Sequence, residues 1–174
     1  TEAQIVVVKF TAFKGLRFLN IVTHPISQWQ QLSLISQLQQ SEADAALMTP
    51  WLRAKNDSVV EFALRLVSIY KCHELHGAVM ACLLHTSRAV RLQAILAARE
   101  IHNESTLPLL LQHFRVATKE EQVLILDILP EINAGTSEIG FLTSLLHHQN
   151  ESIRYRAMQL IQQISPAWSS EVML

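Results

Sequence analysis

The residues best suited to chemistry in this sequence are two cysteines and two histidines close together: Cys72, His73, His76 and Cys82. Thiolates and imidazoles are preferred ligands of Zn²⁺, and a structural site needs four ligands that converge on one tetrahedron. Helical periodicity puts Cys72 and His73 at the end of one helix, with His76 in the turn. Cys82 falls inside the next helix. This layout favours scattered turn and core residues over a zinc site, so we expect no bound metal.

The sequence gives even less support for a catalytic site than for a zinc site. The eight histidines invite a search for an acid–base pair, but the chain has no Gly-x-Ser-x-Gly and no His-Glu-x-x-His. It also lacks a phosphate-binding glycine loop and a dinucleotide-binding fingerprint. We expect His102 in a turn and His113 on a helix surface. The sequence thus predicts no catalytic residue, no cofactor and no small-molecule substrate, so the protein is not expected to be an enzyme.

The composition is that of a folded, all-α protein. The 174 residues are 49% apolar and 17% charged, glycine and proline are scarce, and helix-forming residues dominate. A net charge of −1 lacks the surplus of lysine and arginine that displaces phosphate counterions, so nucleic acid is not an expected partner. No apolar run reaches the roughly 18–20 residues that span a bilayer.

The expected compartment follows from the cysteines. Two cysteines are too few to staple a secreted scaffold, so we expect a reducing compartment, the cytoplasm. The chain begins at Thr1 without a Met, and we expect it to be a piece of a longer protein. A missing segment could then tether the protein to a membrane, which is the alternative location.

The helices are predicted by an apolar pattern that repeats along the chain. When Ala63, Ala94, Ile125 and Ala157 are aligned, apolar residues follow each of them one, three, four and seven positions later. That spacing is one face of an α-helix. In each repeat another helix precedes this one, and its apolar positions align as Met48, Val79, Leu110, Leu142 and as Leu52, Leu83, Phe114, Leu146. We call the two helices the first and the second helix of the repeat. We predict one domain, 1–174, with an orphan second helix at 1–10 and about five helical hairpins, approximately 11–40, 41–73, 74–104, 105–135 and 136–174.

Local signals mark where these helices begin and where they are disturbed. Asn56-Asp57-Ser58 precedes one second helix, and Thr118-Lys119-Glu120-Glu121 has the Thr-x-x-Glu form in which hydroxyl and carboxylate accept from each other's amides. Pro50 and Pro130 fall within predicted helices and remove an N–H donor from each. We expect both helices to bend or end there.

Two segments resemble a known family. Val90-Arg91-x-x-Ala94 and Ile153-Arg154-x-x-Ala157, each after a polar turn, look like the second-helix signature of HEAT repeats. The short period is similar to that of bacterial HEAT-like repeats, since other HEAT units run to about 40–47 residues. The resemblance covers nearly the whole chain and implies a right-handed α–α superhelix, a HEAT-like solenoid. Val60 and Gln122 replace the signature arginine in two units, so any Asp–Arg ladder between repeats is expected to be incomplete.

The resemblance leaves several functions open, because HEAT-like arrays serve as scaffolds, adaptors, lyases and DNA-repair proteins. Trp29, Arg65 and Arg99 could belong to a basic cleft of the kind that HEAT-like DNA glycosylases use. A HEAT-like enzyme or nucleic-acid-binding protein is therefore the alternative function. The missing net positive charge favours packing anchors instead.

The preferred function is that of a non-catalytic scaffold that binds a protein segment. If Ala63 faces the core, residues two positions before and after it point away, and in a solenoid the second helices line the concave surface. The candidate partner-binding residues there mix apolar anchors with a few charges: Trp29, Arg65, Leu92, Leu96, Arg99, Val123, Asp127 and Tyr155. Two interpretations remain open. The face is either a groove for a partner, or a surface that solenoid curvature or a missing repeat covers.

Overall fold

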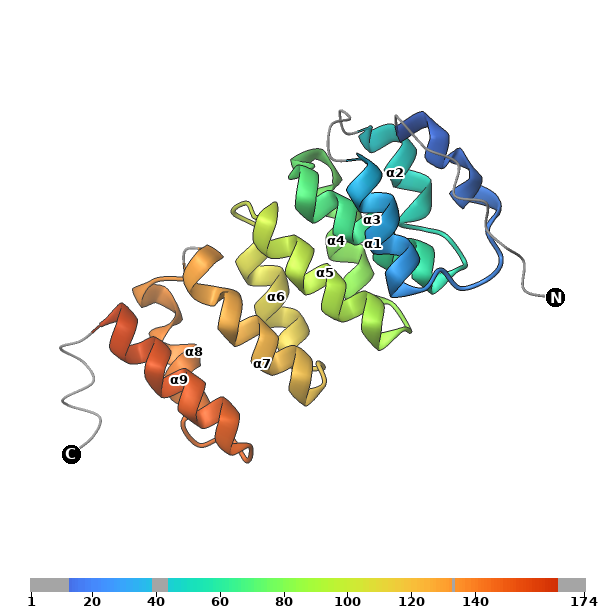
Figure 1. Ribbon diagram of the computed structural model, residues 1–174. Helices are drawn as coiled ribbons and strands as arrows, with labels where there is room; N and C mark the ends of the chain where they lie inside the picture. Colours follow the sequence, from blue (N-terminus) through green and yellow to red (C-terminus); the bar gives the residue numbers. More distant parts are fainter. Residues whose placement is uncertain (1–12, 39–43, 133, 166–174) are drawn as a thin grey trace. The chain divides into compact units, whose positions relative to one another are not determined.

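The computed structural model describes residues 13–38, 44–132 and 134–165, and every regular element in those ranges is a helix (Figure 1). In chain order, with η for 3-10 helices, the elements are η1 (Phe13–Ile21), α1 (Gln28–Leu38), α2 (Ala45–Trp51), α3 (Asp57–Tyr70), η2 (His73–Leu75), α4 (His76–Ala81), η3 (Cys82–Leu84), α5 (Arg88–Glu100), α6 (Thr106–Phe114), α7 (Lys119–Ile128), η4 (Leu129–Ile132), η5 (Thr136–Glu138), α8 (Ile139–Leu145) and α9 (Glu151–Ile164). The all-α prediction is confirmed for these ranges. The orphan helix expected at 1–10 lies outside the described residues.

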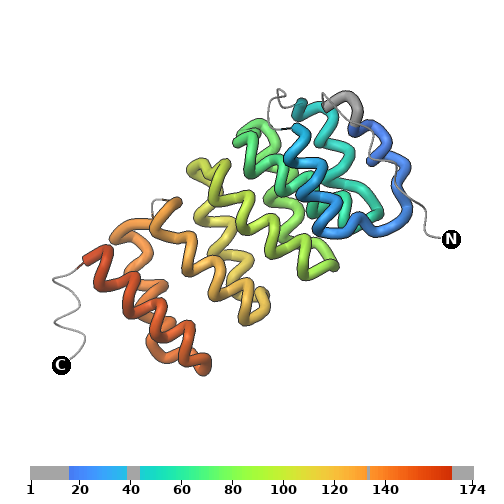
Figure 2. Tube along the Cα trace, in the orientation of Figure 1, coloured from blue at the N-terminus to red at the C-terminus, as the bar shows by residue number. Residues whose placement is uncertain are grey.

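The internal contacts divide the chain into two compact units, Thr1–Ala97 and Ala98–Leu174, with the division inside α5. We call them unit 1 and unit 2. Within each unit, short helices alternate with longer ones across tight turns (Figure 2). The second-helix column is fully buried in both units, with 0% exposure of Ala63, Ala94, Ile125 and Ala157. The first-helix column is equally buried at Met48, Val79, Leu110 and Leu142. The predicted inward faces are therefore confirmed at these positions, whereas Leu146, in the other first-helix column, is only half-buried.

Unit 1 is organised around α3, which runs alongside α1 (Figure 1). The Ile26 amide donates to Ser58 Oγ at 2.8 Å, and Tyr70 Oη donates to the Leu38 carbonyl at 2.5 Å. Each bond joins residues 32 positions apart. Gln31 is buried, and its Nε2 donates to the Ile26 carbonyl (3.2 Å) and the Ser58 carbonyl (3.4 Å). A residue of α1 thus lies level with the residue of α3 that follows it by 32 positions.

Unit 2 is built from α6 to α9 and the last residues of α5. Both α7 and α8 pack against α9. The rings of Phe114 on α6 and Phe141 on α8 meet edge to face, with centroids 5.3 Å apart. Such an edge-on aromatic pair adds about 0.5–1.5 kcal/mol to the area that it buries.

The turns before α5 and α9 are each held by an arginine side chain that donates to two backbone carbonyls. Arg91 Nη1 donates to the carbonyls of His85 (2.8 Å) and Thr86 (2.9 Å). Arg154 Nη1 donates to the carbonyls of His148 (2.8 Å) and of the next residue (3.0 Å). The two arginines of the HEAT-like signature therefore hold the turn that precedes their own helix.

One departure from that sequence pattern has a local substitute. Gln122 Nε2 donates to the Phe114 carbonyl at 3.0 Å, so the shorter side chain still bonds back to the preceding helix. The bonds near Val60 are of another kind. Asn56 Nδ2 donates to the carbonyls of Val22 (3.2 Å) and His24 (2.8 Å), which lie in the loop after η1. These bonds join the start of α3 to that earlier loop and do not replace the arginine bonds within a turn.

Helix starts and breaks agree with the local signals. Asn56 caps α3 by accepting from the amide two residues later (3.1 Å). Thr118 and Glu121 form the reciprocal capping box, with amide-to-oxygen distances of 3.2 and 3.4 Å. The α2 helix ends one residue after Pro50, and α7 gives way to the 3-10 helix η4 that contains Pro130. Both proline predictions are confirmed.

Candidate functional site

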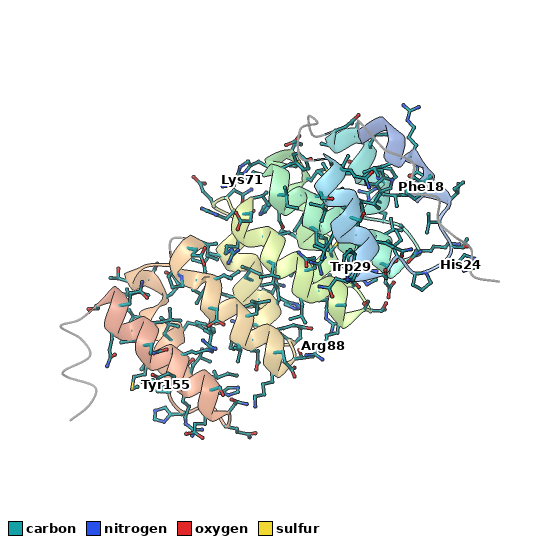
Figure 3. The ribbon with its side chains drawn as sticks, in the orientation of Figure 1. Phe18, His24, Trp29, Lys71, Arg88 and Tyr155 are labelled. Carbon is teal, nitrogen blue, oxygen red and sulfur yellow. The ribbon has the colours of Figure 1, made fainter. Side chains whose placement is uncertain are left out.

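In unit 1 the candidate residues lie on α1, α3 and the first part of α5. Trp29 is 82% exposed and projects from α1 (Figure 3). Arg65, Leu92 and Leu96 are half-buried. The turn before α5 lies beside the start of α3, since His85 Nε2 is 4.0 Å from Asp57 Oδ1. The candidates of unit 1 therefore include one exposed aromatic ring and three partly covered side chains.

Arg65 is unusual among the charges of this face. Its Nε is enclosed and, within the described part of the chain, has no hydrogen-bond partner. Glu61 lies one helical turn earlier on α3 and interacts with it electrostatically. Burial raises the pKa of the Glu61 carboxyl, the Arg65 charge opposes that rise, and the Asp57 charge adds to it. The Arg65 guanidinium thus has the Glu61 carboxyl nearby, but its Nε donates no hydrogen bond in the described structure.

In unit 2 the candidate charges are paired. Asp127 on α7 forms an ion pair with Arg156 on α9. Arg99 Nη2 lies 2.9 Å from Glu100 Oε1, and its Nη1 lies 3.5 Å from Glu131 Oε1. Arg99 and Asp127 therefore both have partners of opposite charge within unit 2.

The apolar members of the unit 2 set are Val123 and Tyr155. Val123 is half-buried on α7. Tyr155 is 56% exposed on α9, and its hydroxyl oxygen accepts from Gln159 Nε2 at 3.0 Å (Figure 3). Four of the eight candidates thus lie in each unit.

The Cys72–Cys82 region does not form a metal centre in the described structure. Both thiols are free and buried, and burial raises the pKa of each to about 11, Glu74 adding to the rise at Cys72. Burial, and then His73, lower the pKa of His76. No group of three or more metal-binding side chains converges within the described ranges. Thiols that resist ionisation are poor metal ligands and poor nucleophiles.

The expectation for His76 was wrong in one respect, because the residue begins α4 and is only 7% exposed, so it is not a turn residue. His113 is a second correction. It is also 7% exposed, and its Nε2 lies 3.3 Å from Glu121 Oε2, a carboxylate that is itself buried. The α6 helix turns this imidazole inward because α7 offers a carboxylate there. His102 lies in the turn after α5, as expected.

A cavity that the sequence did not indicate lies in unit 1. It has a volume of about 500 Å³ and is lined by Leu19, Asn20, Ile21, Val22, Thr23, Pro50, Trp51, Ala54, Lys55 and Asn56. Trp51 is buried, and its Nε1 donates to Asn20 Oδ1 at 2.9 Å. None of the lining side chains is acidic, a histidine or a cysteine. The cavity therefore offers shape and apolar surface without an acid–base pair.

The chain matches no protein-family model, no curated protein and no solved structure. In the parts of the chain that the structure describes, every helix is too short or too polar to cross a membrane. The site must therefore be interpreted from its own geometry.

Proposed function

We propose that this chain is a HEAT-like α-solenoid that acts as a non-catalytic scaffold and binds a protein segment along the faces of its second helices. Two features support the repeat arrangement. Buried positions recur at the aligned column of Ala63, Ala94, Ile125 and Ala157. The turns before α5 and α9 have the same arginine tie. In such an array each hairpin buries its inner face against its neighbours and leaves a continuous face for a partner.

The observation that carries the proposed function is the exposure of Trp29. Gln31 and Leu38 on the same helix are buried, whereas the Trp29 indole is 82% exposed. Indole rings are enriched among residues that dominate binding energy at protein interfaces, because they bury a large area with little loss of side-chain freedom. Leu92 and Leu96 in the same unit are half-buried and add partly exposed apolar side chains.

A site-specific crosslinking experiment tests this function. A photo-crosslinking amino acid replaces Trp29 or Tyr155 in the protein expressed in its native host. Leu84 and Val116, which are 81% and 77% exposed, serve as matched control positions away from the second helices. We expect crosslinks to one discrete protein from Trp29 and Tyr155, and not from the controls.

The outcomes separate the alternatives. An equal set of crosslinked products from all four positions, or none from Trp29 and Tyr155, would remove the proposed binding face. Crosslinks to DNA or RNA would favour a nucleic-acid-binding protein, the alternative class. We also propose the cytoplasm as the place of action, because unpaired buried thiols such as Cys72 and Cys82 suit a reducing compartment.

A further inference from the structure

The cavity beside Trp51 is formed by two segments that are far apart in the sequence. One wall is the end of η1 with the loop that follows it, and the other is the end of α2 with the turn before α3. The η1 and α2 helices pack against each other within unit 1 (Figure 1). The cavity volume of about 500 Å³ falls within the range of roughly 300–1,000 Å³ that is typical of small-molecule sites. The cavity is therefore large enough for a small organic ligand.

Side-chain hydrogen bonds fasten the two walls to each other. The Trp51 indole N–H donates to Asn20 Oδ1 at 2.9 Å. Asn56 Nδ2 donates to the carbonyls of Val22 (3.2 Å) and His24 (2.8 Å). These bonds join residues that are 31 to 34 positions apart. Because they hold both walls in place, the cavity is formed before a ligand arrives, and binding would cost little reorganisation.

Most of the described lining of the cavity is apolar. The apolar residues are Leu19, Ile21, Val22, Pro50, Trp51 and Ala54. Ile21 is 80% exposed and Pro50 is also exposed, so part of this apolar surface is in contact with water. Removing apolar surface from water is favourable. A ligand with an apolar body would therefore gain free energy by covering it.

The polar groups of the lining that remain open to a ligand are mainly donors. Asn56 has no donor left, because both of its amide hydrogens are used in the bonds to the opposite wall. Asn20 accepts from Trp51 through Oδ1, which leaves its amide nitrogen. Lys55 is exposed and forms no ion pair in the described part of the chain. Thr23 adds a hydroxyl. The cavity thus offers an ammonium group and an amide donor next to apolar surface.

We infer that this cavity binds a small organic monocarboxylate with an apolar body, an aromatic or medium-chain acid. The carboxylate would accept from Lys55 and from the Asn20 amide nitrogen, while the apolar body covers Ile21 and its neighbours. No acidic side chain among the described lining residues competes for Lys55. Asp57, two positions later, has its Oδ1 4.0 Å from His85 Nε2. The inference goes beyond the proposed function and is independent of it, because none of the candidate partner-binding residues is among these lining residues.

A monocarboxylate suits the cavity better than a phosphate or a neutral molecule. A phosphate group carries up to about two negative charges and is bound best by several donors that act together, whereas the described lining has one cation, Lys55. An inorganic anion would also leave the apolar lining in water. A neutral apolar molecule would leave the Lys55 ammonium without an acceptor. Only a ligand with one negative charge and an apolar body uses both parts of the lining.

A binding titration with two matched ligands tests the inference. Cinnamate is titrated into the isotope-labelled protein, and NMR follows the backbone amide signals and the Trp51 indole N–H signal. Cinnamamide has nearly the same shape without the charge and is the control ligand. We expect cinnamate to bind with a Kd below about 1 mM and to shift the signals of residues 19–23 and 50–56. Cinnamamide should bind at least about fivefold more weakly.

Two variants with matched controls locate the carboxylate. Lys55→Met should weaken cinnamate binding at least about fivefold and leave cinnamamide binding unchanged. Arg53→Met removes another exposed charge at a residue that does not line the cavity, so it should change cinnamate binding by less than about twofold. Ile21→Asp adds a negative charge at the cavity and should weaken cinnamate binding more than cinnamamide binding. Val116→Asp, at a position 77% exposed in unit 2, should change neither. All four substitutions are at exposed side chains, so each variant is expected to fold, and thermal melts check this.

Each outcome supports or overturns the inference. Tighter binding of cinnamate than of cinnamamide that is lost in Lys55→Met and kept in Arg53→Met supports it. Equal affinity for acid and amide, unchanged binding to Lys55→Met, or shifts confined to residues outside the cavity overturn it. Absence of binding by both cinnamate and octanoate at about 5 mM overturns it as well. Displacement of cinnamate by an equal concentration of inorganic phosphate would show that the cavity binds an ion only, which also overturns it. The crosslinking from Trp29 and Tyr155 decides the proposed function separately.

Discussion

The candidate faces of the two units differ in how their charges are satisfied. In unit 1, Arg65 on α3 has an enclosed Nε without a partner in the described structure. In unit 2, Asp127 is paired with Arg156, and Arg99 is paired with Glu100 and Glu131. Equivalent positions of one sequence pattern thus have different roles. The unit 2 charges connect its own elements, whereas the enclosed Nε of the unit 1 arginine makes no such link in the described structure.

The difference lies in what stands at the same level on the neighbouring element. Asp127 on α7 meets an arginine that comes 29 positions later on α9, within reach of its carboxylate. Arg65 on α3 has Ser33 level with it on α1. A charge on one of these helices forms an ion pair with the next helix only when that helix brings the opposite charge to the same level.

The largest effect is expected from Glu121→Ala in unit 2. The substitution leaves the buried His113 imidazole without its carboxylate and removes one half of the capping box with Thr118. Leaving a buried polar group without a partner costs about 1–3 kcal/mol, and a lost cap about 1 kcal/mol. Since the α7 amides can still be capped by the Thr118 hydroxyl, we expect the free energy of unfolding to fall by about 3 kcal/mol in urea denaturation.

A matched control is Lys119→Ala, which changes an exposed residue in the same first turn of α7. Its effect should stay within about 0.5 kcal/mol. Equal losses of unfolding free energy in Glu121→Ala and Lys119→Ala would show that the buried Glu121 carboxylate does not stabilise unit 2.

The next effect concerns pH and is confined to unit 1, which holds both cysteines. Burial raises the pKa of Cys72 and of Cys82 from 9.0 to about 11. The unfolded thiols ionise first, so the stability from these thiols is complete below pH 9 and is lost as the pH rises towards 11. Each thiol should contribute up to about 3 kcal/mol to that loss, of which about half is reached by pH 10.

The measurement is the urea midpoint of wild type and of Cys72→Ala/Cys82→Ala at pH 8 and pH 10. Tyrosine and lysine titration affects both proteins alike, so the difference between them isolates the thiols. The wild type should lose more stability over this interval. Parallel losses would contradict the raised pKa values.

The inward faces of the helices could be predicted from the sequence because burial follows a period that the chain itself displays. Ala63, Ala94, Ile125 and Ala157 are fully buried, and each has its apolar neighbours on one face of the helix. The capping box at Thr118 could be predicted because it needs only four consecutive residues. A repeated apolar pattern and a four-residue capping box can be recognised without knowing how the helices pack against one another.

The candidate site was less predictable because it depends on contacts between elements. His113 looked like a surface residue until α7 placed the Glu121 carboxylate against it. The pairing of Asp127 with Arg156 depends on the register of α7 against α9, which no single helix encodes. The cavity beside Trp51 depends on a loop held by side-chain bonds far along the chain. The contacts between helices thus required the structure, even where the sequence predicted each helix.

A smaller effect of opposite sign is expected from Arg65→Met. Methionine keeps much of the aliphatic chain and removes an enclosed donor that has no partner in the described structure. Relief of that desolvation should raise the free energy of unfolding by about 1 kcal/mol. Arg53→Met, at an exposed position, should change it by less than about 0.5 kcal/mol. A loss of stability in Arg65→Met beyond that of the control would mean that Arg65 already serves the fold.

The smallest effect is expected at the Asp127–Arg156 pair, and it tests the unit 2 side of the comparison. The two side chains are 40% and 36% exposed, so water and salt weaken their attraction. Exposed pairs of this kind contribute about 0.2–1 kcal/mol. A double-mutant cycle of Asp127→Asn and Arg156→Met should therefore give a coupling free energy in that range, and it should shrink in high salt. Zero coupling at low salt would show that the Asp127 charge does not connect α7 to α9, and the contrast between the two units would disappear.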